Sequence, residues 1–180
     1  MKIIQTPIES LLIIEPRIFQ DERGSFFETW NEYLFRNNGL DIKFLQDNQS
    51  VSHKGVLRGL HFQNPPFEQG KLVRVIKGSV LDVAVDLRQG SNTYGKHFAI
   101  ELTGDNNKMF WIPPGFAHGF LTLEDNTIFA YKCTNIYNKD SEGCILWNDQ
   151  DLNIEWGLPN PVVSDKDQLG IRFSDFNSKF

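Results

Sequence analysis

Short apolar segments separated by turn residues dominate the middle of the chain. Runs rich in Val, Ile, Phe and Tyr alternate with clusters of Gly, Pro, Asn and Asp, a pattern that predicts β-strands joined by tight turns. The predicted strands cover residues 72–76, 80–87, 96–102, 109–112, 118–123 and 127–133. A strand in roughly every ten residues is typical of an antiparallel sandwich or barrel. We therefore predict an all-β fold, with residues 1–180 forming one domain.

The two ends of the chain are less regular. Extended segments are predicted over 11–19, 25–30 and 44–51. Residues 31–38 are predicted to form a short helix, with Asn31 as its N-cap and Gly39 ending it. Near the C-terminus, residues 164–170 predict a capped helical turn.

Four polar side chains interrupt the apolar pattern between residues 55 and 78: Arg58, His61, Gln63 and Lys71. Strand alternation places Lys71 on one face with Val73 and Val75, and His61 on one face with Gln63. If the two strands pair, His61 and Lys71 can point into one cavity. Strict alternation would turn Arg58 away from His61, so we expect a bend or bulge near Gly59.

Composition narrows the class of protein. The formal charge is -5 and the pI is near 5.3, which argues against general binding to nucleic acids. No apolar run approaches the length of a membrane span, and the N-terminus lacks the pattern of a signal peptide. The two cysteines, Cys133 and Cys144, have neither metal-type nor redox-type spacing. We expect reduced thiols and a cytoplasmic protein.

The segment PPGFAHGFLTL, residues 113–123, resembles the second signature of the cupin superfamily and directs His118 inward. In the first cupin signature, two histidines and a glutamate are usual. The matching positions here are His61, Gln63 and Lys71, which put an ammonium where a metal-binding carboxylate would stand. We therefore expect no metal and no cofactor.

Longer motifs carry a more specific resemblance. They run in order along nearly the whole chain: FQDERGSFFETW, FLQDNQSVS, GVLRGLHFQ, QGKLVRVIKGSVLDVAVDLR, WIPPGFAHGF, YKCTNIY, EGCILWND and SDKD. Together they are similar to the dTDP-4-dehydrorhamnose 3,5-epimerase family. The resemblance implies a cupin-type jelly roll and an isomerase that inverts carbons 3 and 5 of dTDP-4-dehydro-6-deoxy-D-glucose, in dTDP-L-rhamnose biosynthesis.

The same resemblance implies catalytic roles. His61 matches the general base, oriented by the carboxylate of Asp167, and Tyr131 matches the general acid on the opposite face of the sugar. Tyr137 is a second candidate for the acid. Lys71 would lie near the 4-keto oxygen and stabilise the enolate.

Binding residues and a partner also follow from the resemblance. Arg58 suits the pyrophosphate, since a guanidinium makes bidentate contacts with phosphate. The other matched substrate-binding residues, beside Lys71, are Arg23, Glu28, Gln46, Asp47, Asn48, His118, Glu142 and Lys166. The family implies a homodimer in which N-terminal strands join the partner's sheet, and unpaired strand edges favour such pairing.

Several alternatives remain open on sequence alone. A related mono-epimerase that acts only at carbon 3 or carbon 5 would share the base, and a 3,4-ketoisomerase fits the polar set less well. A metal-dependent cupin oxygenase and a non-catalytic sugar-nucleotide binder represent other classes. The order of the two inversions and the nucleotide-base preference are not encoded in any motif we recognise.

Overall fold

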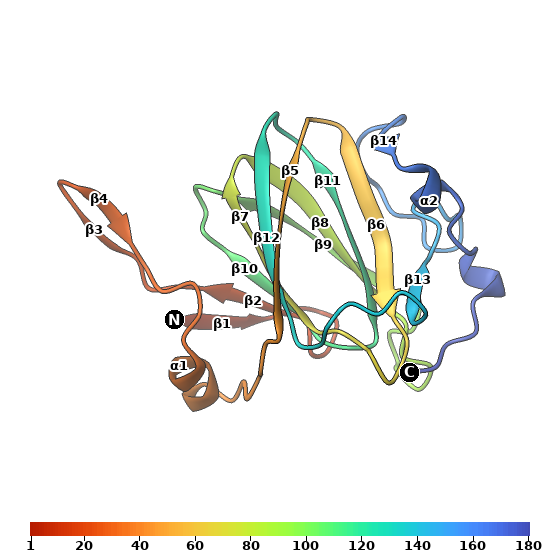
Figure 1. The fold of residues 1–180 in the computed structure, drawn as a ribbon, viewed down its shortest axis with the longest axis horizontal. Helices are drawn as coiled ribbons and strands as arrows, with labels where there is room; N and C mark the ends of the chain where they lie inside the picture. The colour runs from red at the N-terminus through yellow and green to blue at the C-terminus, as the bar shows by residue number, and fades with distance from the viewer.

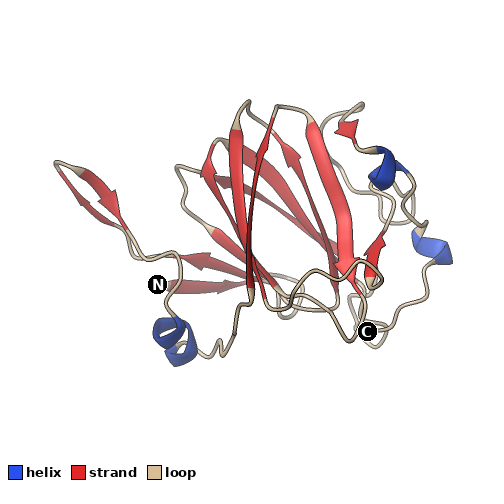
Figure 2. Ribbon diagram, in the orientation of Figure 1, coloured by secondary structure: helices blue, strands red, loops and turns tan.

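Two antiparallel sheets packed face to face form the body of the protein (Figures 1 and 2). The computed structural model describes residues 1–180. The first sheet has the strand order β1-β2-β10-β7-β12-β5. The second has the order β13-β6-β11-β8-β9, and β14 pairs with β6 in parallel. The prediction of an all-β fold is confirmed.

The strands are β1 (Lys2–Gln5), β2 (Leu12–Glu15), β3 (Phe19–Asp21), β4 (Gly24–Phe26), β5 (Gln46–Ser52), β6 (Val56–Gln63), β7 (Lys71–Lys77), β8 (Ser79–Asp86), β9 (His97–Thr103), β10 (Met109–Ile112), β11 (Phe116–Thr122), β12 (Thr127–Cys133), β13 (Glu142–Cys144) and β14 (Val162–Val163). The helices are α1 (Glu32–Asn37), α2 (Asp165–Gln168) and the 3-10 turn η1 (Phe173–Asp175). None of the helices combines the length and apolarity needed to cross a membrane.

Three apolar clusters hold these layers together. The largest lies between the sheets and includes Val73, Phe110 and Phe129. A second packs the outer face of the β6-containing sheet against the C-terminal segment around Trp156. A third packs the outer face of the β7-containing sheet against α1 through Phe35. The alternation of the strands therefore buries side chains on both faces of each sheet.

A hairpin formed by β3 and β4 projects away from this body (Figure 1). All six of its strand residues are exposed, including Phe19 and Phe26. The extended segment predicted over 25–30 is shorter than expected, because the strand ends at Phe26. Helix α1 follows with Asn31 as its N-cap, whose side chain accepts a hydrogen bond from the backbone N–H of Leu34, as predicted.

The strands that carry His61 and Lys71 do not pair, so the condition stated for their sharing a cavity is not met. Strand β6 lies between β13 and β11, whereas β7 lies between β10 and β12 in the opposite sheet. The loop between Gln63 and Lys71 contains Pro65 and Pro66 and carries the chain from one sheet to the other. His61 and Lys71 nevertheless come together, because both project into the space between the sheets.

The predicted bulge near Gly59 is present. Opposite β11, His118 is paired with His61 but Phe120 is paired with Arg58, so β6 has one extra residue at this point. Gly59 adopts a φ of +135°, a value that favours glycine. The bulge lets Arg58 and His61, three residues apart, lie on the same face of the sheet, although Arg58 is exposed.

We predict that Gly59→Ala destabilises the protein by more than about 2 kcal/mol. A Cβ at this position would lie 2.5 Å from the Cα of Gly119, and backbone on the neighbouring strand cannot move aside cheaply. Urea denaturation would measure the loss. Gly90→Ala is the matched control, since a Cβ there meets nothing within 4 Å. Equal stability of the two variants would contradict this account of the bulge.

Candidate active site

A cavity of about 160 Å³ opens between the two sheets. Its walls come from both sheets and from the loop after β12. Strand β6 supplies His61, β7 supplies Lys71 and β12 supplies Tyr131. The remaining lining residues are Phe62, Gln63, Gln69, Tyr137 and Glu142. An imidazole, an ammonium and a phenol thus share one small space.

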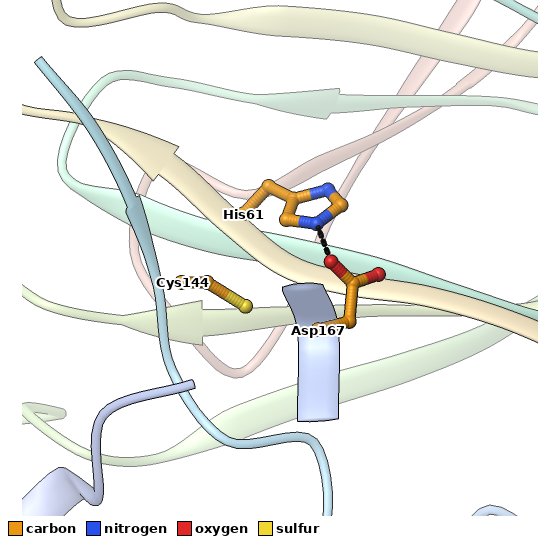
Figure 3. Close-up of side chains that lie close together, drawn as sticks. All are labelled: His61, Cys144 and Asp167. Carbon is orange, nitrogen blue, oxygen red and sulfur yellow. Dashed lines mark hydrogen bonds and ion pairs between the residues drawn. The ribbon is translucent and has the colours of Figure 1, made fainter. Parts of the chain in front are cut away.

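The imidazole of His61 is held by the carboxylate of Asp167. The Nε2–Oδ1 distance is 2.7 Å, and Figure 3 shows the second ring nitrogen on the side away from Asp167. A carboxylate at Nε2 favours the tautomer with its proton on Nε2, which leaves a lone pair on Nδ1. The predicted contact between His61 and Asp167 is therefore present, although their roles stay predictions.

Asp167 is itself tightly positioned. Its Oδ2 accepts a hydrogen bond of 3.1 Å from the backbone N–H of Gly59, so the bulge in β6 also fixes the carboxylate. Its own N–H donates to Ser164 Oγ, the N-cap of α2, within the helical turn predicted over 164–170. Burial raises the pKa of Asp167, but the hydrogen bond and the charge of His61 and the contact with Gly59 outweigh burial and lower the pKa overall.

Lys71 points into the cavity from the facing sheet. Its ammonium lies 3.4 Å from the backbone oxygen of His61, the one hydrogen bond it makes within the chain. Burial lowers the pKa of Lys71, while nearby Cys133, Asp82 and Glu142 act in the opposite direction. A poorly solvated ammonium with a single weak partner is well suited to bind an anionic oxygen.

The two candidate tyrosines have different surroundings. Tyr131 is partly buried beside Phe129, and burial raises the pKa of its phenol. Tyr137 is exposed, and its hydroxyl donates to Glu142 Oε2 at 2.9 Å. The hydrogen bond to Glu142 raises the pKa of Tyr137. Of the two, only Tyr131 has a hydroxyl without a partner in the chain, and this difference favours it as a proton donor.

Glu142 joins the rim of the cavity to α2. Lys166 Nζ lies 2.5 Å from the same Oε2 that accepts from Tyr137. Burial raises the pKa of Glu142, but the contacts with Lys166 and Tyr137 lower it overall. The predicted binding residues Glu142 and Lys166 are therefore in direct contact, and Glu142 lines the cavity.

His118 does not line the cavity. It is buried on β11, directly opposite His61 in the strand register, and its Nε2 lies 2.9 Å from Asp82 Oδ2. Burial lowers the pKa of His118 against the opposing effect of Asp82. Asp82 was not among the predicted residues, although an acid inside the apolar run VLDVAVD is a signal that could have identified it. Gln69 and Cys144 were also overlooked.

The polar residues of β5 divide between two faces. Gln46 Oε1 accepts the backbone N–H of Tyr137 at 2.8 Å, and Asn48 lies against Cys133 on the interior side. Asp47 faces outward and forms an ion pair with Lys132. Arg58 Nε donates to Ser52 Oγ at 3.2 Å. The positive charge of Arg58 partly offsets the rise that burial causes in the pKa of Tyr131. Gln46, Asn48 and Arg58 are thus near the cavity, whereas Asp47 is not.

Arg23 and Glu28 lie away from the cavity. Arg23 is at the tip of the projecting hairpin, where its guanidinium pairs with Asp21 (Figure 1). Glu28 accepts a hydrogen bond from Asn31 just before α1. One copy of the chain therefore does not bring these two predicted residues to the site.

Comparison with known proteins gives a consistent result. The family model described as dTDP-4-dehydrorhamnose 3,5-epimerase matches residues 5–175. A curated protein of that name from Shigella flexneri is 51% identical over 176 residues, which are 97% of each chain. The crystal structure of dTDP-6-deoxy-D-glucose-3,5-epimerase RmlC from Legionella pneumophila in complex with dTDP-4-keto-L-rhamnose has a TM-score of 0.93 and 46% identity, and the match covers 98% of this chain and 94% of that one.

A more distant structure bears on the alternatives. ChmJ, a 3'-monoepimerase from Streptomyces bikiniensis in complex with dTDP-quinovose, has a TM-score of 0.87 and 32% identity, over 94% of this chain and 86% of that one. The strand arrangement and these relatives together confirm the predicted cupin-type fold.

We predict that Asp167→Asn lowers the free energy of unfolding at pH 7 by about 1–3 kcal/mol. Because the folded-state pKa of Asp167 is depressed, its contribution is present above the unfolded value of about 3.9 and disappears as the pH falls through the folded value. Denaturation of both proteins between neutral and acid pH should therefore show the difference shrinking below about pH 4. Asp165→Asn, which removes an exposed carboxylate from the same helix, should give no such trend. A difference for Asp167→Asn that is constant with pH would contradict the assignment.

Proposed function

Because the chain belongs to the dTDP-4-dehydrorhamnose 3,5-epimerase family, we propose that it converts dTDP-4-dehydro-6-deoxy-D-glucose into dTDP-4-dehydro-L-rhamnose. The reaction inverts carbons 3 and 5, whose hydrogens are acidic because the neighbouring 4-keto group delocalises the carbanion. No redox step is involved. The enzyme needs a base on one face of the ring, an acid on the other and stabilisation of the enolate.

The observation that carries this proposal is the position of His61 and Tyr131 on opposite walls of one cavity. With the Nε2 proton donated to Asp167, His61 Nδ1 removes the hydrogen from carbon 3 or carbon 5. Tyr131 then delivers a proton from the other sheet. Its raised pKa keeps the phenol protonated at neutral pH. Tyr137 is the weaker candidate, because its hydroxyl is already donated to Glu142.

Lys71 supplies the charge that the enolate requires. The 4-keto oxygen gains negative charge as the proton leaves, and a fixed ammonium in a poorly solvated cavity stabilises that charge more than water would. Positioned acid–base groups typically contribute about 10²–10⁴-fold to a rate. Enolate stabilisation by Lys71 therefore has to account for much of the remaining acceleration.

The size of the cavity indicates which part of the substrate it can hold. At about 160 Å³ the cavity is smaller than the roughly 300–1,000 Å³ common for sites of drug-sized ligands. We infer that it holds the sugar ring and that the nucleotide lies outside it. Arg58, Gln46, Asn48, Glu142 and Lys166 surround the opening and are suited to bind the phosphates and thymidine. His118 and Asp47 act less directly, through the packing of His61 and the edge of β5.

We propose that the protein is a homodimer, because one copy does not bring all the predicted binding residues to its cavity. The exposed β3–β4 hairpin reaches away from its own cavity, and its length and polarity suit a contribution to the site of a second copy. Arg23 and Glu28 would bind the thymidine portion there, while N-terminal strands extend the partner's sheet. We also propose that the protein is a single domain that works in the cytoplasm, with its two cysteines reduced.

We predict that the protein incorporates deuterium at carbons 3 and 5 of dTDP-4-dehydro-6-deoxy-glucose in D₂O, and that His61→Ala abolishes incorporation at both. Proton NMR would follow each position separately. Tyr131→Phe should retain exchange but lower inverted product by about 10²-fold or more, because the base still acts while the acid is missing. Tyr137→Phe is the matched control and should change product formation far less.

The outcomes separate the alternatives. Exchange at carbon 3 alone would identify a mono-epimerase, as the similarity to ChmJ allows. Tight binding of the nucleotide sugar without exchange would identify a non-catalytic binder. Equal effects of the two tyrosine variants would remove Tyr131 as the proposed acid.

A site shared between two copies has a direct test. Arg23→Ala and His61→Ala should each have low activity at substrate concentrations below KM. After the two variants are mixed through partial unfolding and refolding, activity should recover to about a quarter of the wild-type rate, since half the dimers are mixed and one of their two sites is intact. Mixing His61→Ala with Tyr131→Phe is the control, since both residues belong to the same cavity. No recovery in the mixture of Arg23→Ala with His61→Ala would overturn the shared site, and so would equal recovery in the control.

A further inference from the structure

Cys144 has no part in the proposed reaction, yet it lies beside the base. Strand β13 pairs with β6 so that Cys144 is directly opposite His61. Directly opposed residues in an antiparallel pair project from the same face of a sheet. The thiol, the imidazole and the carboxylate of Asp167 are consequently neighbours, although they come from three separate elements (Figure 3).

The three donor atoms are close enough to share one ion. The sulfur of Cys144, a ring nitrogen of His61 and a carboxylate oxygen of Asp167 all lie within 4.8 Å of one another. Tetrahedral zinc, with bonds of about 2.0–2.3 Å, separates its ligands by roughly 3.3–3.6 Å. The site would have to close by about 1 Å on the sulfur side and open slightly between His61 and Asp167. Rotation of three side chains can supply such movements.

The chemistry of the donors selects the kind of ion. One thiolate, one imidazole and one carboxylate are a combination typical of zinc and other thiophilic divalent cations, and unlike the all-oxygen sets that bind Mg²⁺ or Ca²⁺. A divalent cation with one thiolate and one carboxylate is also electrically neutral, which suits a site where Asp167 is only 3% exposed. His61 borders the cavity, so an ion has a route inward.

We propose that His61, Cys144 and Asp167 form a binding site for a thiophilic divalent cation of the zinc class, and that the bound ion inhibits the enzyme. The ion is an inhibitor here and not a cofactor. The inhibitory effect rests on the proposed function of His61 as the base, whereas the binding itself does not.

Inhibition follows from the tautomer of His61. In the active form Nε2 carries the ring proton, donated to Asp167, and Nδ1 carries the lone pair. An ion bound at Nε2 requires the neutral ring to carry its proton on Nδ1 instead, and the lone pair that accepts the substrate proton is lost. Cys144 exchanges its S–H bond for a sulfur–metal bond and releases that proton to solvent. One proton is released for each ion bound, and no oxidation takes place.

The test uses Cd²⁺ alone as the probe, on the full chain. A thiolate bound to Cd²⁺ gives a charge-transfer absorption in the near ultraviolet, which we expect to saturate at about one ion per chain. Cys144→Ser should abolish the band, and His61→Ala should weaken the affinity by about 10-fold or more, since it removes a second ligand. Deuterium exchange into the substrate should fall by on the order of 10²-fold with Cd²⁺ and return after EDTA.

Cys133→Ala is the matched control, because it removes the other thiol of the chain, which is buried and is not one of the three clustered donors. It should keep both the band and the inhibition. A band that persists in Cys144→Ser, or an affinity that is unchanged in His61→Ala, would overturn the site. Binding at Cys144 without loss of exchange would support the site and argue against Nδ1 of His61 as the base, so failure of the proposed function is distinguishable from failure of the site.

Discussion

The hydrogen bond between His61 and Asp167 is the contact on which the candidate site depends. The two residues are 106 positions apart, and Asp167 lies on the short helix α2. Its Oδ2 accepts a hydrogen bond from the backbone N–H of Gly59, while its backbone N–H donates to Ser164 Oγ, so both its side chain and its main chain are held in place. The bulge in β6 therefore positions both His61 and the carboxylate of Asp167. A change in the backbone at Gly59 would displace both groups together.

Around the His61–Asp167 contact, polar side chains form a layer between the two apolar sheets, and this location changes their acid–base properties. Lys71, Tyr131 and the buried Asp82–His118 pair all project between the sheets, where water is scarce. Scarce water lowers the pKa of Lys71 and raises that of Tyr131. The same environment strengthens each interaction with charge that develops on a substrate. The surrounding apolar clusters thus tune the groups that the strands position.

Much of this arrangement could be predicted from the sequence, and the failures have identifiable causes. Turn residues and alternation locate most strands of the two sheets but not β1, β13 and β14. Alternation, together with the expectation that Arg58 and His61 share a site, also predicts the bulge that brings them to one side. Periodicity reports which face a residue occupies but not which sheet a strand joins. Alternation therefore does not decide whether the strands of His61 and Lys71 pair; they do not, yet both residues line one cavity. Asp167 and Tyr131 could be identified only through resemblance to a family, because long-range contacts leave no local pattern.

Arg23 and Glu28 show what a single chain cannot supply. Motif similarity associates them with substrate binding, yet the hairpin holds Arg23 in an exposed ion pair with Asp21, far from the cavity. Exposed ion pairs contribute little to stability, so Arg23 can exchange its partner readily. Exposed aromatic residues on the same hairpin, Phe19 and Phe26, would also gain from burial. A small cavity, together with a hairpin that projects from the body with its strand residues exposed, is the arrangement that the proposed two-copy site requires.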